Sequence, residues 1–165
     1  MITKQDVRTL YLVRHAKALK GGPAIADIDR PLHDIGILEA YEMANELLQL
    51  EEVPKLIISS TASRAICTAL IFQRVLNISP ENLRVTERLY EIDVRDLFEM
   101  IAELDDTYPS IMLVGHNPSF TLFSAKLDAE ITHIPTGGVV RFDFDAGKWS
   151  HSSYINAQKK MLIYP

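Results

Sequence analysis

The sequence predicts an α/β domain with three layers, in which helices cover both faces of a mostly parallel sheet. Short apolar runs that read as strands alternate with longer segments of helical periodicity along most of the chain. The 165 residues include a hydrophobic fraction of 47%, which suits one globular core of ordinary size. No repeat, low-complexity tract or long linker divides the sequence. We therefore expect residues 1–165 to form a single domain, with little room for a large inserted cap.

The first half of the chain contains two strand–helix units. Asp34 precedes apolar residues at helical spacing and is the expected N-cap of the first helix, which Pro54 separates from the next strand. The hydroxyl groups of residues 59–61 are expected to cap the second helix. The expected elements are a strand at 8–13, a helix at 34–50, a strand at 55–58 and a helix at 62–76.

The second half continues the alternation and ends in strands. The run IMLV at 111–114 is apolar throughout, which is typical of a central parallel strand. Residues 138–144 alternate in polarity, which favours a strand. The expected elements are strands at 83–86, 111–114, 138–144 and 160–164, and helices at 94–104 and 118–127.

Composition narrows the function classes. The formal net charge of −5 argues against a nucleic-acid partner. No apolar stretch is long enough to span a membrane, and the N-terminal MITKQDVRTLYLV lacks the pattern of a signal peptide. Cys67 is the only cysteine, so no internal disulfide can form. We therefore expect a cytoplasmic protein without a membrane or nucleic-acid partner.

The motifs predict no metal and no cofactor. The histidines and the single cysteine lack the close spacing of a zinc site, and the chain contains no glycine-rich nucleotide-binding loop. The spacing from Cys67 to Arg74 does not fit a cysteine phosphatase loop. Cys67 is instead expected in the core, as are Leu38, Leu47 and Leu48.

Basic residues follow three of the expected strands, and this is the most informative pattern in the sequence. Arg14 and His15 follow the first strand, and His116 follows the run IMLV. Arg64 lies in the first turn of the helix after the second strand. Ligands of open α/β sheets bind at the carboxyl ends of the strands. We therefore expect two arginines and two histidines to converge at one edge of the sheet.

Such a cluster suits phosphoryl transfer. Arginine binds phosphate oxygens in a bidentate manner, and helix N-termini add backbone donors. A neutral histidine can attack phosphorus and carry the phosphoryl group as a covalent intermediate. Neighbouring arginines favour the neutral form of that histidine.

The motifs at these strand ends resemble those of the histidine phosphatase superfamily, which has the phosphoglycerate mutase-like fold. Arg14-His15-Ala16 resembles the RHG motif of that family, and the short chain is most similar to the SixA-like phosphohistidine phosphatases. The matching segments occur in family order between about residues 8 and 144. They are LVRHAKA, DIDRPL, IISSTASRAICTA, ERLYE, LVGHNPS and the weaker IPTGGVV.

This resemblance implies roles for four residues of the pocket. His15 would be the nucleophile that becomes phosphorylated, and Arg14 would bind the phosphoryl oxygens beside it. Arg64 matches the second arginine of the family's pocket. His116 matches the second histidine, which stabilises the charge of the transferring group.

Other matching residues have two interpretations each. Asn117 would orient His116 or contact substrate, or it serves only as a turn and cap residue. Arg30 would border the pocket, or it simply pairs with an aspartate of DIDRPL. For the proton donor, Glu91 is the first choice and Glu87 the second, although a phosphoramidate leaving nitrogen needs less help from an acid.

The sequence departs from the family pattern at three places. Ala16 replaces the glycine of the broad motif, as it does in many SixA-like relatives. Lys17 stands where many relatives carry an acid, which adds positive charge and removes one proton donor. His33-Asp34-Ile35 replaces the more usual polar and basic residues after RPL.

The resemblance therefore implies a metal-independent phosphatase that hydrolyses protein phosphohistidine. Its partner would be a phosphorylated protein, such as a histidine-phosphotransfer protein. Two alternatives stay open at this point. One is a phosphomonoesterase that acts on a small molecule or a phosphopeptide, and the other is a non-catalytic module that binds phosphoproteins.

Overall fold

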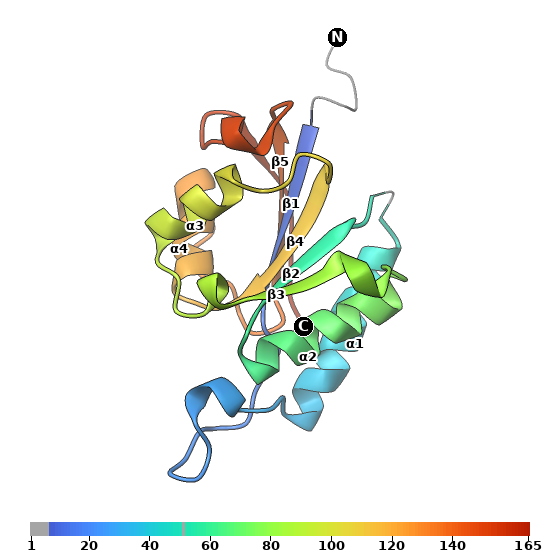
Figure 1. Ribbon diagram of the computed structural model, residues 1–165, viewed down its shortest axis with the longest axis vertical. Helices are drawn as coiled ribbons and strands as arrows, with labels where there is room; N and C mark the ends of the chain where they lie inside the picture. The colour runs from blue at the N-terminus through green and yellow to red at the C-terminus, as the bar shows by residue number, and fades with distance from the viewer. Residues whose placement is uncertain (1–6, 51) are drawn as a thin grey trace.

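Strands and helices alternate along the computed structural model, which describes residues 7–50 and 52–165 (Figure 1). Residues 1–6 of the segment inspected for a signal peptide lie outside the described residues. The strands are β1 (Val7–Arg14), β2 (Leu56–Ser60), β3 (Leu83–Thr86), β4 (Ser110–Gly115), β5 (Val139–Asp145) and β6 (Ala157–Ile163). The helices are α1 (Asp34–Leu48), α2 (Ser63–Val75), α3 (Val94–Ala102) and α4 (Ser119–Leu127).

The six strands form one sheet in the order β3-β2-β4-β1-β5-β6. Strands β3, β2, β4 and β1 run parallel to one another. Strand β5 is antiparallel to β1, and β6 is antiparallel to β5. In the register of the sheet, Arg14 lies beside Gly115, and Ser59 lies beside Val114. The carboxyl ends of β1, β2 and β4 therefore meet at one edge, as the strand pattern predicted.

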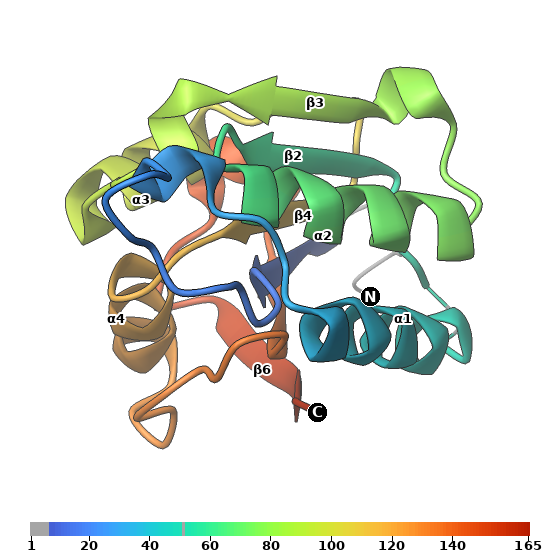
Figure 2. The ribbon, with the colours of Figure 1, turned by 90° about the horizontal axis from the view of Figure 1, so that it is seen from below.

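Helices cover both faces of the sheet, which confirms the three-layer prediction. Helices α1 and α2 lie on one face, and α3 and α4 lie on the other (Figures 1 and 2). Each pair seals a separate apolar core against the sheet. The long connection between β1 and α1 passes in front of the strand ends in Figure 2, which shows the molecule from below.

Several element boundaries differ from the sequence prediction. The N-cap of α1 is His33 rather than Asp34, because the imidazole Nδ1 of His33 accepts a hydrogen bond from the backbone N–H of Ile35 at 3.1 Å. Ala62 precedes α2 and provides no side-chain cap. These differences arise because a cap is defined by local backbone geometry, which residue type alone does not fix.

Three of the predicted core residues are in fact exposed. Leu47 is fully buried, but the side chains of Leu38 and Leu48 are 69% and 46% exposed, and Cys67 is exposed. The inner stripes of α1 and α2 are formed largely by small residues such as Ala40 and Ala65. Leu38 and Cys67 lie on the opposite sides of their helices, because each is about half a turn away from that stripe.

Gly36 allows α1 to approach the chain that follows β1. A Cβ atom at Gly36 would overlap the backbone carbonyl of Lys17. The same carbonyl accepts a hydrogen bond from the backbone N–H of His33 at 2.9 Å. This close approach fixes the start of the connection that borders the strand ends.

No helix within residues 7–50 and 52–165 is long and apolar enough to cross a membrane.

Candidate active site

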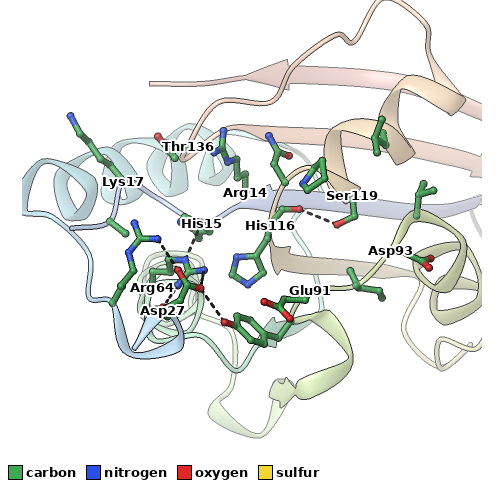
Figure 3. Close-up of a pocket in the computed structure, with 18 residues that line it drawn as sticks. Arg14, His15, Lys17, Asp27, Arg64, Glu91, Asp93, His116, Ser119 and Thr136 are labelled. Atoms are coloured by element: carbon green, nitrogen blue, oxygen red, sulfur yellow. Dashed lines mark hydrogen bonds and ion pairs between the residues drawn. The ribbon is translucent and has the colours of Figure 1, made fainter. Parts of the chain in front are cut away.

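A pocket of about 700 Å³ lies at the carboxyl ends of β1, β2 and β4 (Figure 3). The four basic residues that the sequence analysis singled out all line it. Its wall is built from the strand ends, the β1–α1 connection and the N-terminal turns of α3 and α4. The lining residues are Arg14, His15, Lys17, Ala18, Asp27, Arg30, Arg64, Tyr90, Glu91, Ile92, Asp93, Val94, His116, Asn117, Pro118, Ser119, Leu122 and Thr136.

The hydrogen bonds of His15 define which of its ring nitrogens carries the proton. Its Nδ1 lies 2.8 Å from the carbonyl oxygen of Ala16, which can only accept, so Nδ1 is the donor. In the neutral ring Nε2 then holds a lone pair. The Nε–H of Arg64 donates to this Nε2 over 3.2 Å. His15 thus presents an unprotonated nitrogen next to a guanidinium group.

Burial keeps both histidines of the pocket neutral. Desolvation, together with smaller contributions from the positive charges of Arg64 and Arg14, lowers the pKa of His15 to about 4. Desolvation also lowers the pKa of His116 to about 3, with smaller contributions from His15 and Arg64. Their ring centroids lie 5.1 Å apart. At neutral pH the pocket therefore contains two uncharged imidazoles between cationic side chains.

Asp27 holds together the charged side of the pocket. Its carboxylate accepts from Nη2 of Arg64 at 2.9 Å and from Nη1 of Arg30 at 2.9 Å. The hydroxyl of Tyr90 donates to the same carboxylate at 3.0 Å. Hydrogen bonds from Arg30, and then from Arg64 and Tyr90, lower the pKa of Asp27 to about 2. Asp27 is therefore an anion that orients Arg64, with the Nε–H of that residue left to face His15.

His116 lies against the second strand. Its Nε2 is 2.7 Å from the hydroxyl oxygen of Ser60, the last residue of β2. The ring of Tyr90 packs edge-on against it, with centroids 5.8 Å apart. His116 is 8% exposed, so these contacts fix the ring at the base of the pocket.

Arg14 is positioned by the segment that precedes β5. Its Nη1 donates to the carbonyl oxygen of Ile134 at 2.9 Å. Gly137, which has a φ of 76°, donates its backbone N–H to the carbonyl oxygens of Arg14 and His15. Glycine adopts this left-handed conformation without steric cost. The weak IPTGGVV motif thus supports the end of β1 directly.

The structure bears differently on Asn117 and Arg30, the two residues for which the sequence left a functional and a structural interpretation. Both polar ends of the Asn117 amide are bonded within the protein, since Nδ2 donates to Ile134 and Oδ1 accepts from Thr121. This favours its structural interpretation, although it borders the pocket. Arg30 both lines the pocket and pairs with Asp27, so its two interpretations hold together.

The two carboxylates considered as proton donors lie in different places. Glu91 lines the pocket, whereas Glu87 is not among the lining residues. Glu91 has a φ of 56°, a conformation that is uncommon for residues other than glycine. The adjacent Tyr90 is tied to Asp27, so the loop that presents Glu91 is anchored to the charged side of the pocket.

An apolar wall closes the opposite side of the pocket. Ile92 precedes α3, Val94 is its first residue, and Leu122 comes from the first turns of α4. The side chain of Asp93, the N-cap of α3, lies between the two apolar residues in sequence and also lines the pocket. The N-terminal turn of α4 also borders the pocket and adds the positive end of a helix dipole. The pocket therefore combines a cationic side with an apolar side.

Sequence reasoning missed the roles of Asp27, Tyr90 and Ser60. Asp27 was considered only as a partner of Arg30, although DIDRPL places it three residues before that arginine. Tyr90 and Ser60 belong to the quoted motifs ERLYE and IISSTASRAICTA. Each acts through a contact with a residue distant in sequence, which no local spacing reveals.

Among the described residues, no three His, Cys, Asp or Glu side chains gather closely enough to hold a metal ion.

Comparison with known proteins places this pocket in a family. The model of the histidine phosphatase superfamily (branch 1) matches residues 10–123, which include His15, Arg64 and His116. A protein of uncharacterised function from Mycobacterium leprae is 28% identical over 161 residues, which cover 88% of this chain and 95% of that protein.

Solved structures share the fold over nearly the whole chain. The crystal structure of a candidate phosphohistidine phosphatase SixA from Agrobacterium tumefaciens is 27% identical, with a TM-score of 0.82 over 96% of this chain and 98% of that one. A mycobacterial glucosyl-3-phosphoglycerate phosphatase, at 16% identity, has a TM-score of 0.63 over 96% of this chain and 98% of that one. The fold is thus the phosphoglycerate mutase-like fold of the SixA structures. The chain belongs to the histidine phosphatase superfamily, and it is a phosphatase.

Proposed function

We propose that this phosphatase hydrolyses phosphohistidine on proteins through a covalent phosphohistidine formed on His15. One observation carries the proposal. The Nδ1–H of His15 is bound to the carbonyl of Ala16, which leaves the Nε2 lone pair in a pocket lined by Arg14, Arg64 and His116. A nucleophile held in one tautomer beside two guanidinium groups suits an attack on phosphorus.

The reaction has two balanced steps. First, Nε2 of His15 attacks phosphorus, the bond from phosphorus to the substrate nitrogen breaks, and the leaving imidazole takes up a proton. Second, water attacks the phosphorus on His15, the P–Nε2 bond breaks, and inorganic phosphate leaves with His15 again neutral. Arg14 and Arg64 balance the charge on the phosphoryl oxygens in both steps, and His116 donates a hydrogen bond to one of these oxygens.

Glu91 is the proposed proton donor for the leaving group. It lines the pocket, and its left-handed backbone conformation persists in a loop anchored through Tyr90. Unusual backbone geometry of this kind is often retained at functional sites. The same carboxyl group would then accept a proton from the attacking water in the second step.

The likeness to the SixA structure from Agrobacterium tumefaciens supports phosphohistidine as the substrate class. A phosphorylated protein, such as a histidine-phosphotransfer protein, would be the partner. A small-molecule phosphomonoesterase is the second candidate, because the pocket of about 700 Å³ also suits a small phosphate ester and the fold is shared with a glucosyl-3-phosphoglycerate phosphatase. Membership of a phosphatase family argues against the non-catalytic binding module.

The first test measures phosphate release from a phosphohistidine peptide by the wild type and by His15→Ala. We expect release by the wild type, loss of release by His15→Ala, and unchanged release by the control His133→Ala, which replaces an exposed histidine. Trapping with ³²P-labelled substrate should label the wild type with an acid-labile, base-stable bond. Release of phosphate from p-nitrophenyl phosphate but not from the peptide would instead favour the phosphomonoesterase.

A further inference from the structure

A groove between α3 and α4 continues from the apolar side of the pocket. Val94 and Leu122 line the pocket itself. One helical turn further along, Phe98 and Lys126 line a second hollow of about 560 Å³, which Val94 also borders. Because Val94 lines both, the two hollows lie side by side at the start of α3. Tyr154, from the connection between β5 and β6, also lines this second hollow.

The groove has an apolar floor and a cationic edge. Phe98 packs on Phe123 with ring centroids 4.3 Å apart, and the side chain of Tyr154 is 66% exposed. Arg95 at the rim pairs with Asp96 at 3.2 Å. The exposed Lys126, in contrast, forms no ion pair with any residue in 7–50 and 52–165. A partly exposed aromatic surface that is rimmed by charged side chains marks an interaction site.

The position of the groove selects the kind of molecule. A small phosphorylated compound would occupy the pocket alone. A protein that inserts a phosphorylated side chain into the pocket must also place its neighbouring residues over the surface that leads away from it. Residues one helical turn apart are about 5–6 Å from each other, so the hollow beside Phe98 lies within reach of such neighbours.

We infer that the α3–α4 groove binds the protein substrate beside its phosphorylated histidine. An apolar side chain of the substrate packs on Phe98 and Tyr154, and an acidic side chain pairs with Lys126. This inference rests on the proposed function, because it requires the phosphorylated residue to be part of a protein. It adds a recognition surface that the chemistry at His15 does not use.

The test compares hydrolysis of phosphohistidine within a folded protein with hydrolysis of the free amino acid. The substrates are a histidine-phosphotransfer domain phosphorylated with phosphoramidate, and free phosphohistidine. The variants Tyr154→Ser and Lys126→Glu alter the groove at two exposed positions outside the pocket. Leu38→Ser and Lys55→Glu are the controls. Leu38 is 69% exposed on α1, and Lys55 precedes β2 at the end of that strand away from the pocket.

We expect each groove variant to lower kcat/KM for the phosphorylated domain about fivefold or more, through a higher KM with kcat unchanged. Activity on free phosphohistidine should stay at the wild-type level, and both controls should match the wild type on both substrates. Equal losses on both substrates, or no loss on the domain, would overturn the inference while leaving the proposed function intact. If the wild type hydrolyses neither substrate, the proposed function fails and the inference fails with it. Thermal midpoints of all variants check that the fold is unchanged.

Discussion

The two sides of the pocket are held in different ways. On the cationic side, Asp27 joins Arg64, Arg30 and Tyr90 by ion pairs and hydrogen bonds of about 3 Å. On the apolar side, Val94 and Leu122 line the pocket without comparable polar contacts. The cationic side can hold a charged group in a fixed orientation, because each guanidinium has a defined partner. The apolar side can only exclude water and accommodate shape.

This contrast indicates that the cationic side serves the phosphoryl chemistry and the apolar side serves substrate recognition. The cationic side is built from the β1–α1 connection, the first turn of α2 and the segment between β3 and α3, next to central parallel strands that are covered on both faces. The apolar side grows from helix surfaces on one face of the sheet. Phosphoryl chemistry requires precise placement of charge, whereas recognition of a substrate surface tolerates more variation. Substitutions on the two sides should therefore differ in the kinetic constant that they change.

The largest effect is expected from Arg64→Ala. Removing this guanidinium takes away the donor beside Nε2 of His15 and leaves Asp27 with only Arg30 and Tyr90 as partners. We expect kcat to fall by about 10²–10³-fold, as for other groups that stabilise transition-state charge. Steady-state kinetics on the phosphohistidine peptide measure the effect, and Arg64→Lys should recover only part of it, since an ammonium group cannot bridge the same partners. A change confined to KM would contradict the proposal that Arg64 stabilises the charge of the transition state.

A smaller effect is expected from Asp27→Asn. The amide keeps the size of the side chain but loses the charge that orients Arg64, so we expect kcat to fall about tenfold, as for loss of other supporting polar contacts. Asp29→Asn is the matched control, because Asp29 lies in the same short helical turn but does not line the pocket. Equal effects of the two substitutions would show that Asp27 acts only through general charge or stability.

The pH dependence should be the smallest of these effects. Because burial holds the pKa of His15 near 4, the imidazole is still neutral at pH 5, and kcat/KM should fall less than about twofold between pH 7 and pH 5 once substrate ionisation is corrected. An ordinary histidine with a pKa near 6.5 would lose more than tenfold over that range. NMR titration of the ring, assigned with His15→Ala, measures the pKa directly.

The same shifts predict how stability changes with pH. The folded-state pKa values of His15 and His116 lie below the ordinary value, so the unfolded chain binds protons first as the pH falls. These two histidines therefore lower the free energy of unfolding progressively from about pH 6.5 to pH 3–4. Urea denaturation at pH 7 and pH 5 should show this loss in the wild type, and His15→Ala should reduce it. An identical loss in both proteins would contradict the burial of a neutral His15.

The sequence by itself determined the order of the elements and the residues gathered at one edge of the sheet. Strands with apolar runs and helices with periodic apolar residues were predictable because burial acts on local patterns. Arg14, His15, Arg64 and His116 could be placed together because parallel strands end at a common edge. The resemblance of several ordered motifs also allowed the family to be recognised.

Only the tertiary structure decided which helix faces are buried and which side chains of the pocket form hydrogen bonds and ion pairs with one another. Leu38 and Cys67 are as apolar as their buried neighbours, and the packing of α1 and α2 through small residues turns them outward. Asp27 contacts Arg64 and Tyr90 across 37 and 63 residues of chain. Hydrogen bonds of this kind depend on distances in space between groups far apart in sequence. Local propensity cannot encode such distances, which arise only when the sheet and its helices have packed together.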